Sequence, residues 1–174
     1  MSVLAPDGVR LVQTGKIERS PDGRASEVCL DCGSHGMTRR LFSELPSAGR
    51  VVIVDLEAGI NDLLWAQPGV DDAIIVVTEP YRKSLEVARR ALPVGFDLGV
   101  GRATVVANRV ESEADLQLVV DFLKGIEVEV VVVPEDHHIA AADRAGDSPF
   151  DTGLGSPGVA AVAALALKLS TAVA

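Results

Sequence analysis

Short polar clusters follow apolar runs at several points in the chain, and the first of them combines acidic residues with a glycine. Asp55, Glu57 and Gly59 lie in the string Asp-Leu-Glu-Ala-Gly-Ile, directly after four β-branched residues. An acidic side chain at a strand end can hold a metal-bound water, and a glycine four residues later can offer its N–H to a terminal phosphate. The alternative is an aspartate that caps the turn, and the hexapeptide alone leaves both readings open.

Two further clusters carry groups suited to a nucleotide base. Asn108 and Arg109 follow an apolar run, and an amide side chain offers both a donor and an acceptor to a base edge. The alternative is an asparagine that makes a local turn. Pro134, Glu135 and Asp136 follow the next run, where the proline restricts the chain as it leaves the strand. The acidic pair can either cap the next helix or lie beside a base or ribose.

A pair of cysteines, Cys29 and Cys32, forms a C-x-x-C string. The first residues show no basic stretch followed by a long apolar run, so a cytoplasmic location is expected. There, paired cysteines more often bind metal or do redox chemistry than cross-link a fold. Free thiols in a loop and a thioredoxin-like redox pair remain as alternatives.

The elements that must position these clusters alternate between strand and helix patterns. Apolar β-branched runs predict strands at 51–54, 73–77, 103–107 and 128–133, with a weaker run at 9–13. Helical spacing predicts helices at 36–45, 82–92, 113–124, 139–145 and 158–174. This alternation predicts an α/β fold with a doubly wound, mostly parallel sheet, in which ligands bind at the carboxyl ends of the strands.

Some helix details can be predicted from spacing. Leu85, Ala88 and Leu92 share one face of the helix at 82–92. Ser112 and Asp115 form a capping-box pattern at the start of the helix at 113–124, with aspartate in place of glutamate. In that helix Leu116, Val119, Val120 and Leu123 form the apolar pattern, and in the last helix Val159, Val162, Leu165 and Leu169 share a face.

Length and charge limit the classes of protein. A chain of 174 residues has room for one domain, 1–174, and 48% hydrophobic residues indicate a globular fold. The net charge of −9 argues against a nucleic-acid partner and against binding to anionic lipid, although one nucleotide needs only local donors. The C-terminal apolar segment carries only Lys168, so we expect a core helix and no stable membrane insertion.

The order of the motifs resembles the second half of the MinD/ParA-type P-loop ATPases. The chain reads V-D-x-E-A-G-I, then T-E-P, A-N-R-V and V-P-E-D-x-x-I-x-x-A-D-x-x-G. The resemblance covers residues 9–155. The D-x-E-A-G-I form is similar to the CooC subgroup, ATPases that help to insert nickel into carbon monoxide dehydrogenase. The resemblance implies an ATP-binding domain that works with Mg²⁺, as a homodimer, with a metalloenzyme client.

The resemblance also implies roles for the clusters. Asp55 would act on the Mg²⁺ shell and Gly59 would sense the γ-phosphate, with Glu57 in the same nucleotide-binding motif. Asn108 would read adenine, helped by the backbone of Pro134, Glu135 and Asp136. Arg109 would belong to the same nucleotide-binding site. Cys29 and Cys32 would bind Zn²⁺ or Ni²⁺ across a dimer interface, although the subgroup generally shows C-x-C.

One motif of the family does not occur. The phosphate loop K-G-G-x-G-K-[ST] is not in the sequence: Gly15-Lys16 is followed by Ile17, and Arg10 stands where the loop needs its first glycine. The expectation is therefore an incomplete sheet that lacks the first strand and the P-loop, in a truncated product that cannot hydrolyse ATP alone. ATP and Mg²⁺ would bind only if this loop were supplied.

Two other readings remain. The first is a non-catalytic module that dimerises or holds metal as a scaffold. The second is a receiver-like signalling domain, because Asp55 and Thr78 end consecutive predicted strands. The receiver reading lacks an acidic pair near the N-terminus, and Arg109 stands where it expects a lysine.

Overall fold

The computed structural model describes residues 2–5, 8–12, 51–56, 60, 63 and 72–171. The chain divides into two compact units, Met1–Gln67 and Pro68–Ala174, and each is described by itself. The prediction that 1–174 form a single domain stays a prediction.

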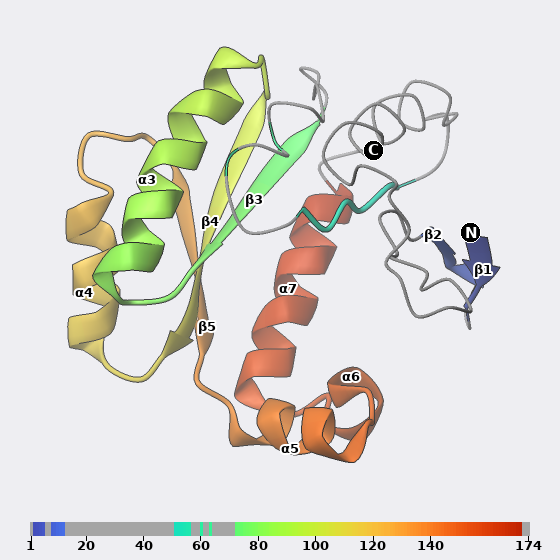
Figure 1. The fold of residues 1–174 in the computed structure, drawn as a ribbon. Helices are drawn as coiled ribbons and strands as arrows, with labels where there is room; N and C mark the ends of the chain where they lie inside the picture. Colours follow the sequence, from blue (N-terminus) through green and yellow to red (C-terminus); the bar gives the residue numbers. More distant parts are fainter. Residues whose placement is uncertain are drawn as a thin grey trace, which may run out of the picture. The chain divides into compact units, whose positions relative to one another are not determined.

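A parallel three-stranded sheet is the centre of the second unit (Figure 1). It consists of β3 (Ala73–Thr78), β4 (Arg102–Val110) and β5 (Glu129–Pro134), in the order β3-β4-β5. Both strand pairs are parallel. Three of the predicted strands and the α/β, parallel character of the fold are thereby confirmed.

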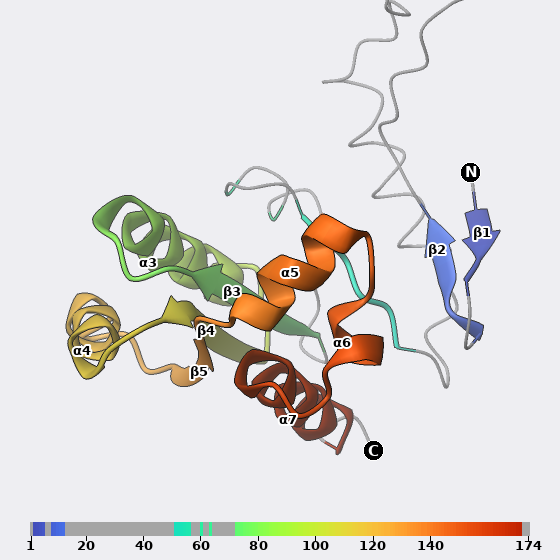
Figure 2. The same cartoon turned by 90° about the horizontal axis from the view of Figure 1, so that it is seen from below.

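Helices cover both faces of this sheet (Figures 1 and 2). On one face lie α3 (Arg82–Asp97) and α4 (Glu113–Phe122), and on the other α7 (Pro157–Thr171) packs against β5. Short helices α5 (His137–Ala145) and α6 (Pro149–Thr152) connect β5 to α7. The coverage is uneven, because Ile75 and Val77 of β3 are exposed, Val77 to 61%.

The apolar spacing of α3 predicts its buried face correctly. Leu85, Ala88 and Leu92 are fully buried, as their common face requires. Near the end of the helix, Gly95 lies against the sheet, where a Cβ would meet Ile74 Cδ1 at 3.4 Å, an ordinary van der Waals contact. Helix α3 thus packs directly on β3.

The capping box that begins α4 is confirmed in both of its hydrogen bonds. Ser112 Oγ accepts a hydrogen bond from the Asp115 N–H at 3.2 Å, and Asp115 Oδ2 accepts one from the Ser112 N–H at 2.9 Å. The predicted apolar face is confirmed for Val119 and Leu123, which are buried, whereas Leu116 is half-buried and Val120 is exposed. Aspartate therefore completes this box as glutamate does elsewhere.

The predicted C-terminal helix forms as α7, but it is only partly a core helix. Val159 is buried, whereas Val162 is exposed, because the helix touches the sheet mainly along β5. Lys168 forms an ion pair with Glu129 of β5. Among the residues that the structure describes, no helix is both long and apolar enough to cross a lipid bilayer.

The expected strand at 51–54 is not formed, and this prediction is wrong. Residues 51–56 have neither strand nor helix structure, and Ile53 is 90% exposed. An apolar run becomes a strand only where a neighbouring strand satisfies its N–H and C=O groups, and among the described residues this run has no such partner.

The weaker run at 9–13 does form a strand, but in an arrangement that was not expected. Strand β2 (Arg10–Val12) pairs antiparallel with β1 (Ser2–Leu4). The predicted helix at 36–45 lies outside the described residues.

Candidate functional site

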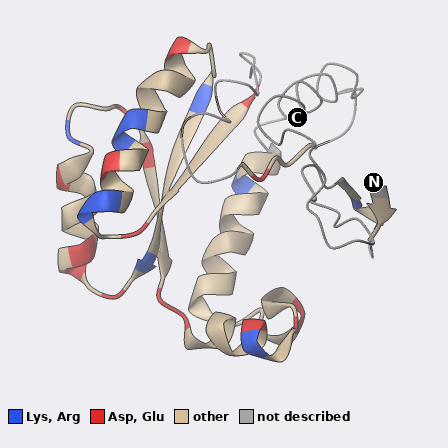
Figure 3. Cartoon of the chain, viewed as in Figure 1, with Lys and Arg blue, Asp and Glu red and all other residues tan. Residues whose placement is uncertain are grey.

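Three charged side chains gather where the parallel strands end. Glu79 follows β3, Arg109 lies near the end of β4, and Glu135 follows β5. Because the strands are parallel and adjacent, their carboxyl ends meet at one edge of the sheet. Figure 3 shows this edge as a basic segment at the end of β4 between acidic segments that leave β3 and β5.

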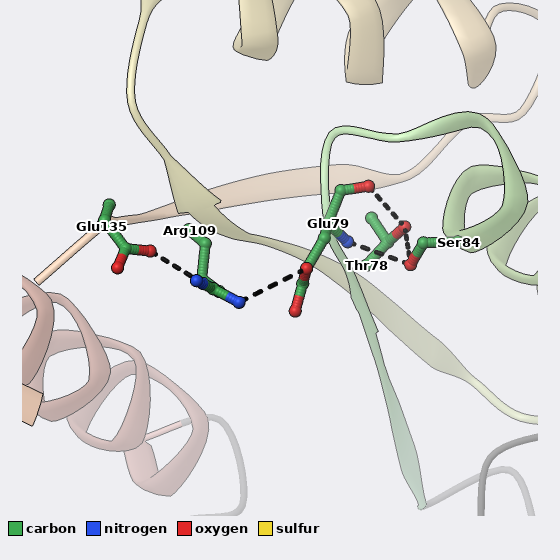
Figure 4. A network of polar contacts seen from close by, with 5 residues as sticks. All are labelled: Thr78, Glu79, Ser84, Arg109 and Glu135. Atoms are coloured by element: carbon green, nitrogen blue, oxygen red, sulfur yellow. Dashed lines mark hydrogen bonds and ion pairs between the residues drawn. The ribbon is translucent and has the colours of Figure 1, made fainter. Parts of the chain in front are cut away.

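Arg109 bridges the two carboxylates (Figure 4). Its Nε donates a hydrogen bond to Glu135 Oε2 at 2.8 Å, and its Nη1 lies 3.9 Å from Glu79 Oε2. The hydrogen bond to Glu135, followed by the charges of Glu135 and Glu79, raises the pKa of Arg109 above its ordinary value. The Arg109 side chain remains 59% exposed, so the bridge lies at the surface and within reach of a ligand.

The backbone at Arg109 is unusual. Asn108 pairs with Val133 and Val110 with Pro134, so Arg109 is an extra residue on β4 opposite β5. Its φ is 57°, in the left-handed region that residues other than glycine rarely adopt. Beyond it the strands remain joined, because the Glu135 N–H donates to Val110 O at 3.1 Å. Such a bulge turns a side chain away from the regular alternation of the strand.

Asn108 is the last regularly paired residue before this bulge. It is half-buried on the central strand, and within the described part of the chain no side-chain hydrogen bond is found for its amide group. Pro134 lies at the end of the neighbouring strand β5. The structure therefore brings Asn108, Arg109, Pro134 and Glu135, which were singled out in separate motifs, to one edge of the sheet.

A second polar cluster fixes the end of β3 and was missed by the sequence reasoning. The Thr78 and Ser84 hydroxyl oxygens lie 3.0 Å apart, and the Glu79 N–H donates to Ser84 Oγ at 3.0 Å (Figure 4). A charged residue directly after a strand, followed by serine in the first turn of a helix, was the available signal. Thr78, which the receiver reading uses because it ends a predicted strand, is 1% exposed, and its hydroxyl lies in contact with Ser84.

The Asp136 carboxylate connects two helix N-termini, so the capping alternative is confirmed for this residue. Oδ1 accepts a hydrogen bond from the His138 N–H at 2.9 Å. Oδ2 accepts one from Ser156 Oγ at 2.6 Å and one from the Gly158 N–H at 2.8 Å. The Ser156 hydrogen bond, followed by those from Gly158 and His138, lowers the pKa of Asp136. Its carboxylate is therefore committed to joining α5 and α7.

The other predicted site residues lie in the first unit. Asp55 is exposed. Glu57, Gly59, Cys29 and Cys32 lie outside the described residues, so their roles stay predictions. Within residues 2–5, 8–12, 51–56, 60, 63 and 72–171, no group of three or more His, Cys, Asp or Glu side chains is placed to hold a metal ion.

Comparison with known proteins gives several relatives, although no protein-family model matches the chain. The carbon monoxide dehydrogenase accessory protein CooC of Rhodospirillum rubrum is 28% identical over 145 residues, which is 83% of this chain and 52% of that protein. An uncharacterized ATP-binding protein of Methanocaldococcus jannaschii is 32% identical over 142 residues, 79% of this chain and 52% of that protein. Among solved structures, the MinD cell division protein of Aquifex aeolicus matches with a TM-score of 0.49 and 20% identity, over 57% of this chain and 44% of that one.

The homologues of this chain thus include proteins named as ATP-binding, and the resemblance to the CooC subgroup is confirmed at the level of homology. CooC is one of these homologues. The chain spans about half the length of the curated relatives that it matches.

Proposed function

We propose that this chain is part of a CooC-like ATP-binding protein and that the edge formed by β3, β4 and β5 receives the adenine end of the nucleotide. The observation that carries the proposal is the position of Asn108. It lies at the carboxyl end of the central strand, beside the end of β5, with an amide group that is not engaged by described side chains. Open α/β sheets bind ligands at this edge.

The described residues fit the base end of a nucleotide. The Asn108 amide can donate to and accept from an adenine edge, and Pro134 supplies an apolar surface one strand away. We propose that the C=O groups from Pro134 to Asp136 assist, because the Glu135 N–H is already used by Val110 O. Bound ATP would be held here by its base.

For the phosphate end, the proposal retains the roles expected from the motifs. Asp55 would act on the Mg²⁺ shell, Gly59 on the γ-phosphate, and Glu57 would lie beside them. Hydrolysis needs the amides and lysine of a phosphate loop, which we propose is contributed from outside this sequence. The coverage of about half of each relative supports this part of the proposal. The chain alone is then expected to turn over no ATP.

We further propose that two copies of the chain share one Zn²⁺ or Ni²⁺ ion through Cys29 and Cys32. In this proposal the dimer acts in the cytoplasm and serves a metalloenzyme client. Two thiolates supply half of a tetrahedral site, which a symmetric dimer would complete. Support comes from the homologue named as an accessory protein of a metalloenzyme. Metal titration with light scattering tests this: equal metal binding and equal mass after Cys29→Ala with Cys32→Ala would overturn it.

The base site is tested by titrating the isotope-labelled chain with AMP, ATP and GMP and following amide resonances. AMP and ATP should perturb the same amides around Asn108 and Glu135, because both present adenine, and GMP should perturb them less. Asn108→Ala should abolish these shifts. Gln117→Ala, which removes an exposed amide group on α4, is the matched control and should leave them unchanged. Shifts that survive Asn108→Ala, or that are absent from the wild-type chain, would refute the base site.

A further inference from the structure

The three strand ends of the second unit are joined by one side chain. Arg109 lies on the central strand, and its guanidinium reaches a carboxylate from each neighbouring strand end, Glu135 at 2.8 Å and Glu79 at 3.9 Å. The Glu79 backbone is itself held by the hydrogen bond that its N–H donates to Ser84 Oγ. We call Glu79, Arg109 and Glu135 the strand-end bridge. It is the close-range polar contact across β3, β4 and β5 that Figure 4 shows.

The bridge coincides with the backbone bulge. A large side chain at a φ of 57° persists only where the surroundings stabilise that conformation. Here the ion pair with Glu135 holds the Arg109 side chain. The hydrogen bond from the Glu135 N–H to Val110 O holds the backbone beyond the bulge. If Arg109 returned to regular strand geometry, it would take the position opposite Pro134 that Val110 now occupies.

From this geometry we infer that Arg109 is a positioning residue: the strand-end bridge locks the left-handed bulge and thereby fixes the direction of the adjacent Asn108 amide at the edge of the sheet. Arg109 acts through Asn108 and not on a ligand directly, since its guanidinium is already engaged by two carboxylates. The effect on nucleotide binding rests on the proposed function, but the effect on Asn108 does not.

Three variants separate what the charge of Arg109, the planar shape of its guanidinium and the backbone at residue 109 each contribute to the bridge. Arg109→Gly removes the guanidinium, and glycine adopts the left-handed region about as readily as regular strand geometry, so this variant should fold without strain but leave the bulge unlocked. Arg109→Lys keeps a positive charge but loses the planar fork. Glu135→Gln removes the carboxylate and keeps its shape. The matched control is Glu86→Gln, which breaks the exposed Arg82–Glu86 ion pair of 3.2 Å on α3.

The first readout needs no ligand. The side-chain NH₂ resonances and side-chain couplings of Asn108 should report one conformation in the wild-type chain and in Glu86→Gln. In Glu135→Gln and Arg109→Gly, the Asn108 resonances should shift and the couplings should average between conformers. Arg109→Lys should give values between those of the wild type and those of these two variants. The double variant of Arg109→Gly with Glu135→Gln should add nothing to either single change, because both remove the same bridge. An unchanged Asn108 signal in the two single variants would overturn the inference.

The second readout is AMP affinity, measured on the same samples. Loss of the bridge should weaken AMP binding by up to about fivefold, the upper end of what one exposed ion pair contributes. If AMP fails to bind the wild-type chain, the proposed function fails while the Asn108 signal still decides the inference. If AMP binds equally well to all variants and the Asn108 signal does not move, the positioning role is refuted and the base site stands.

Discussion

The polar cluster at the end of β3 allows a prediction with a magnitude. Ser84 Oγ accepts the Glu79 N–H at 3.0 Å and lies 3.0 Å from the Thr78 hydroxyl, which is buried. Ser84→Ala removes both contacts, and each hydrogen bond contributes about 0.5–1.5 kcal/mol net. The free energy of unfolding should therefore fall by about 1–3 kcal/mol. Since Thr78 retains a weak alternative acceptor in Glu79 O at 3.4 Å, the lower half of this range is expected.

The assay is urea unfolding at 25 °C, followed by far-ultraviolet circular dichroism. Ser84→Ala should lower the midpoint with an unchanged slope. Thr78→Val keeps the shape of the buried side chain and removes one of the two contacts, so it should cost less than Ser84→Ala. In the double variant the two losses should not add, because they share the Thr78–Ser84 contact. Ser170→Ala is the control, since the exposed Ser170 hydroxyl donates a hydrogen bond to Leu167 O within α7. A Ser84→Ala variant within about 0.5 kcal/mol of the wild type would refute the reasoning.

Three further predictions concern the scaffold of the site. Leu92→Ala should destabilise the chain by about 2–5 kcal/mol in urea unfolding, because Leu92 is fully buried, whereas exposed Val87→Ala should cost far less. Ser112→Ala should cost about 1 kcal/mol by removing the capping box of α4; no loss in the same assay would contradict the cap's role. The pKa of Asp136 is lower in the folded than in the unfolded chain, so its stabilising effect is full above about pH 4 and is lost as the pH falls further. The stability difference between wild type and Asp136→Asn, measured from pH 7 to pH 2, should therefore shrink below pH 4; a constant difference would contradict this.

Part of the candidate site could be predicted from the sequence. Asn108 and Pro134 were identified because each follows an apolar run, and parallel strands bring their carboxyl ends together. The alternative roles of Asp136 could not be separated in advance. Its three donors come from His138, Ser156 and Gly158, and the last two lie about 20 residues further along the chain. A cap that joins two helices depends on how those helices pack.

Local patterns determined the secondary structure of the second unit. The spacing of Leu85, Ala88 and Leu92 predicts the buried face of α3, and Ser112 with Asp115 predicts the start of α4, because these signals act within one or two helical turns. The run at 51–54 shows the limit of such patterns. Its residues favour a strand as strongly as those of β3, but a strand exists only where another strand supplies hydrogen-bond partners.

Tertiary structure alone decided the details of the sheet edge. No sequence signal marks Arg109 as an extra residue at a φ of 57°, because arginine has no preference for the left-handed region. The bulge exists because Val110 pairs with Pro134 and because Glu135 and Glu79 approach from neighbouring strands. Those contacts join residues 26 and 30 positions away from Arg109. The chain's own residues determine which elements form, whereas contacts between distant segments decide where the charged groups at their ends meet.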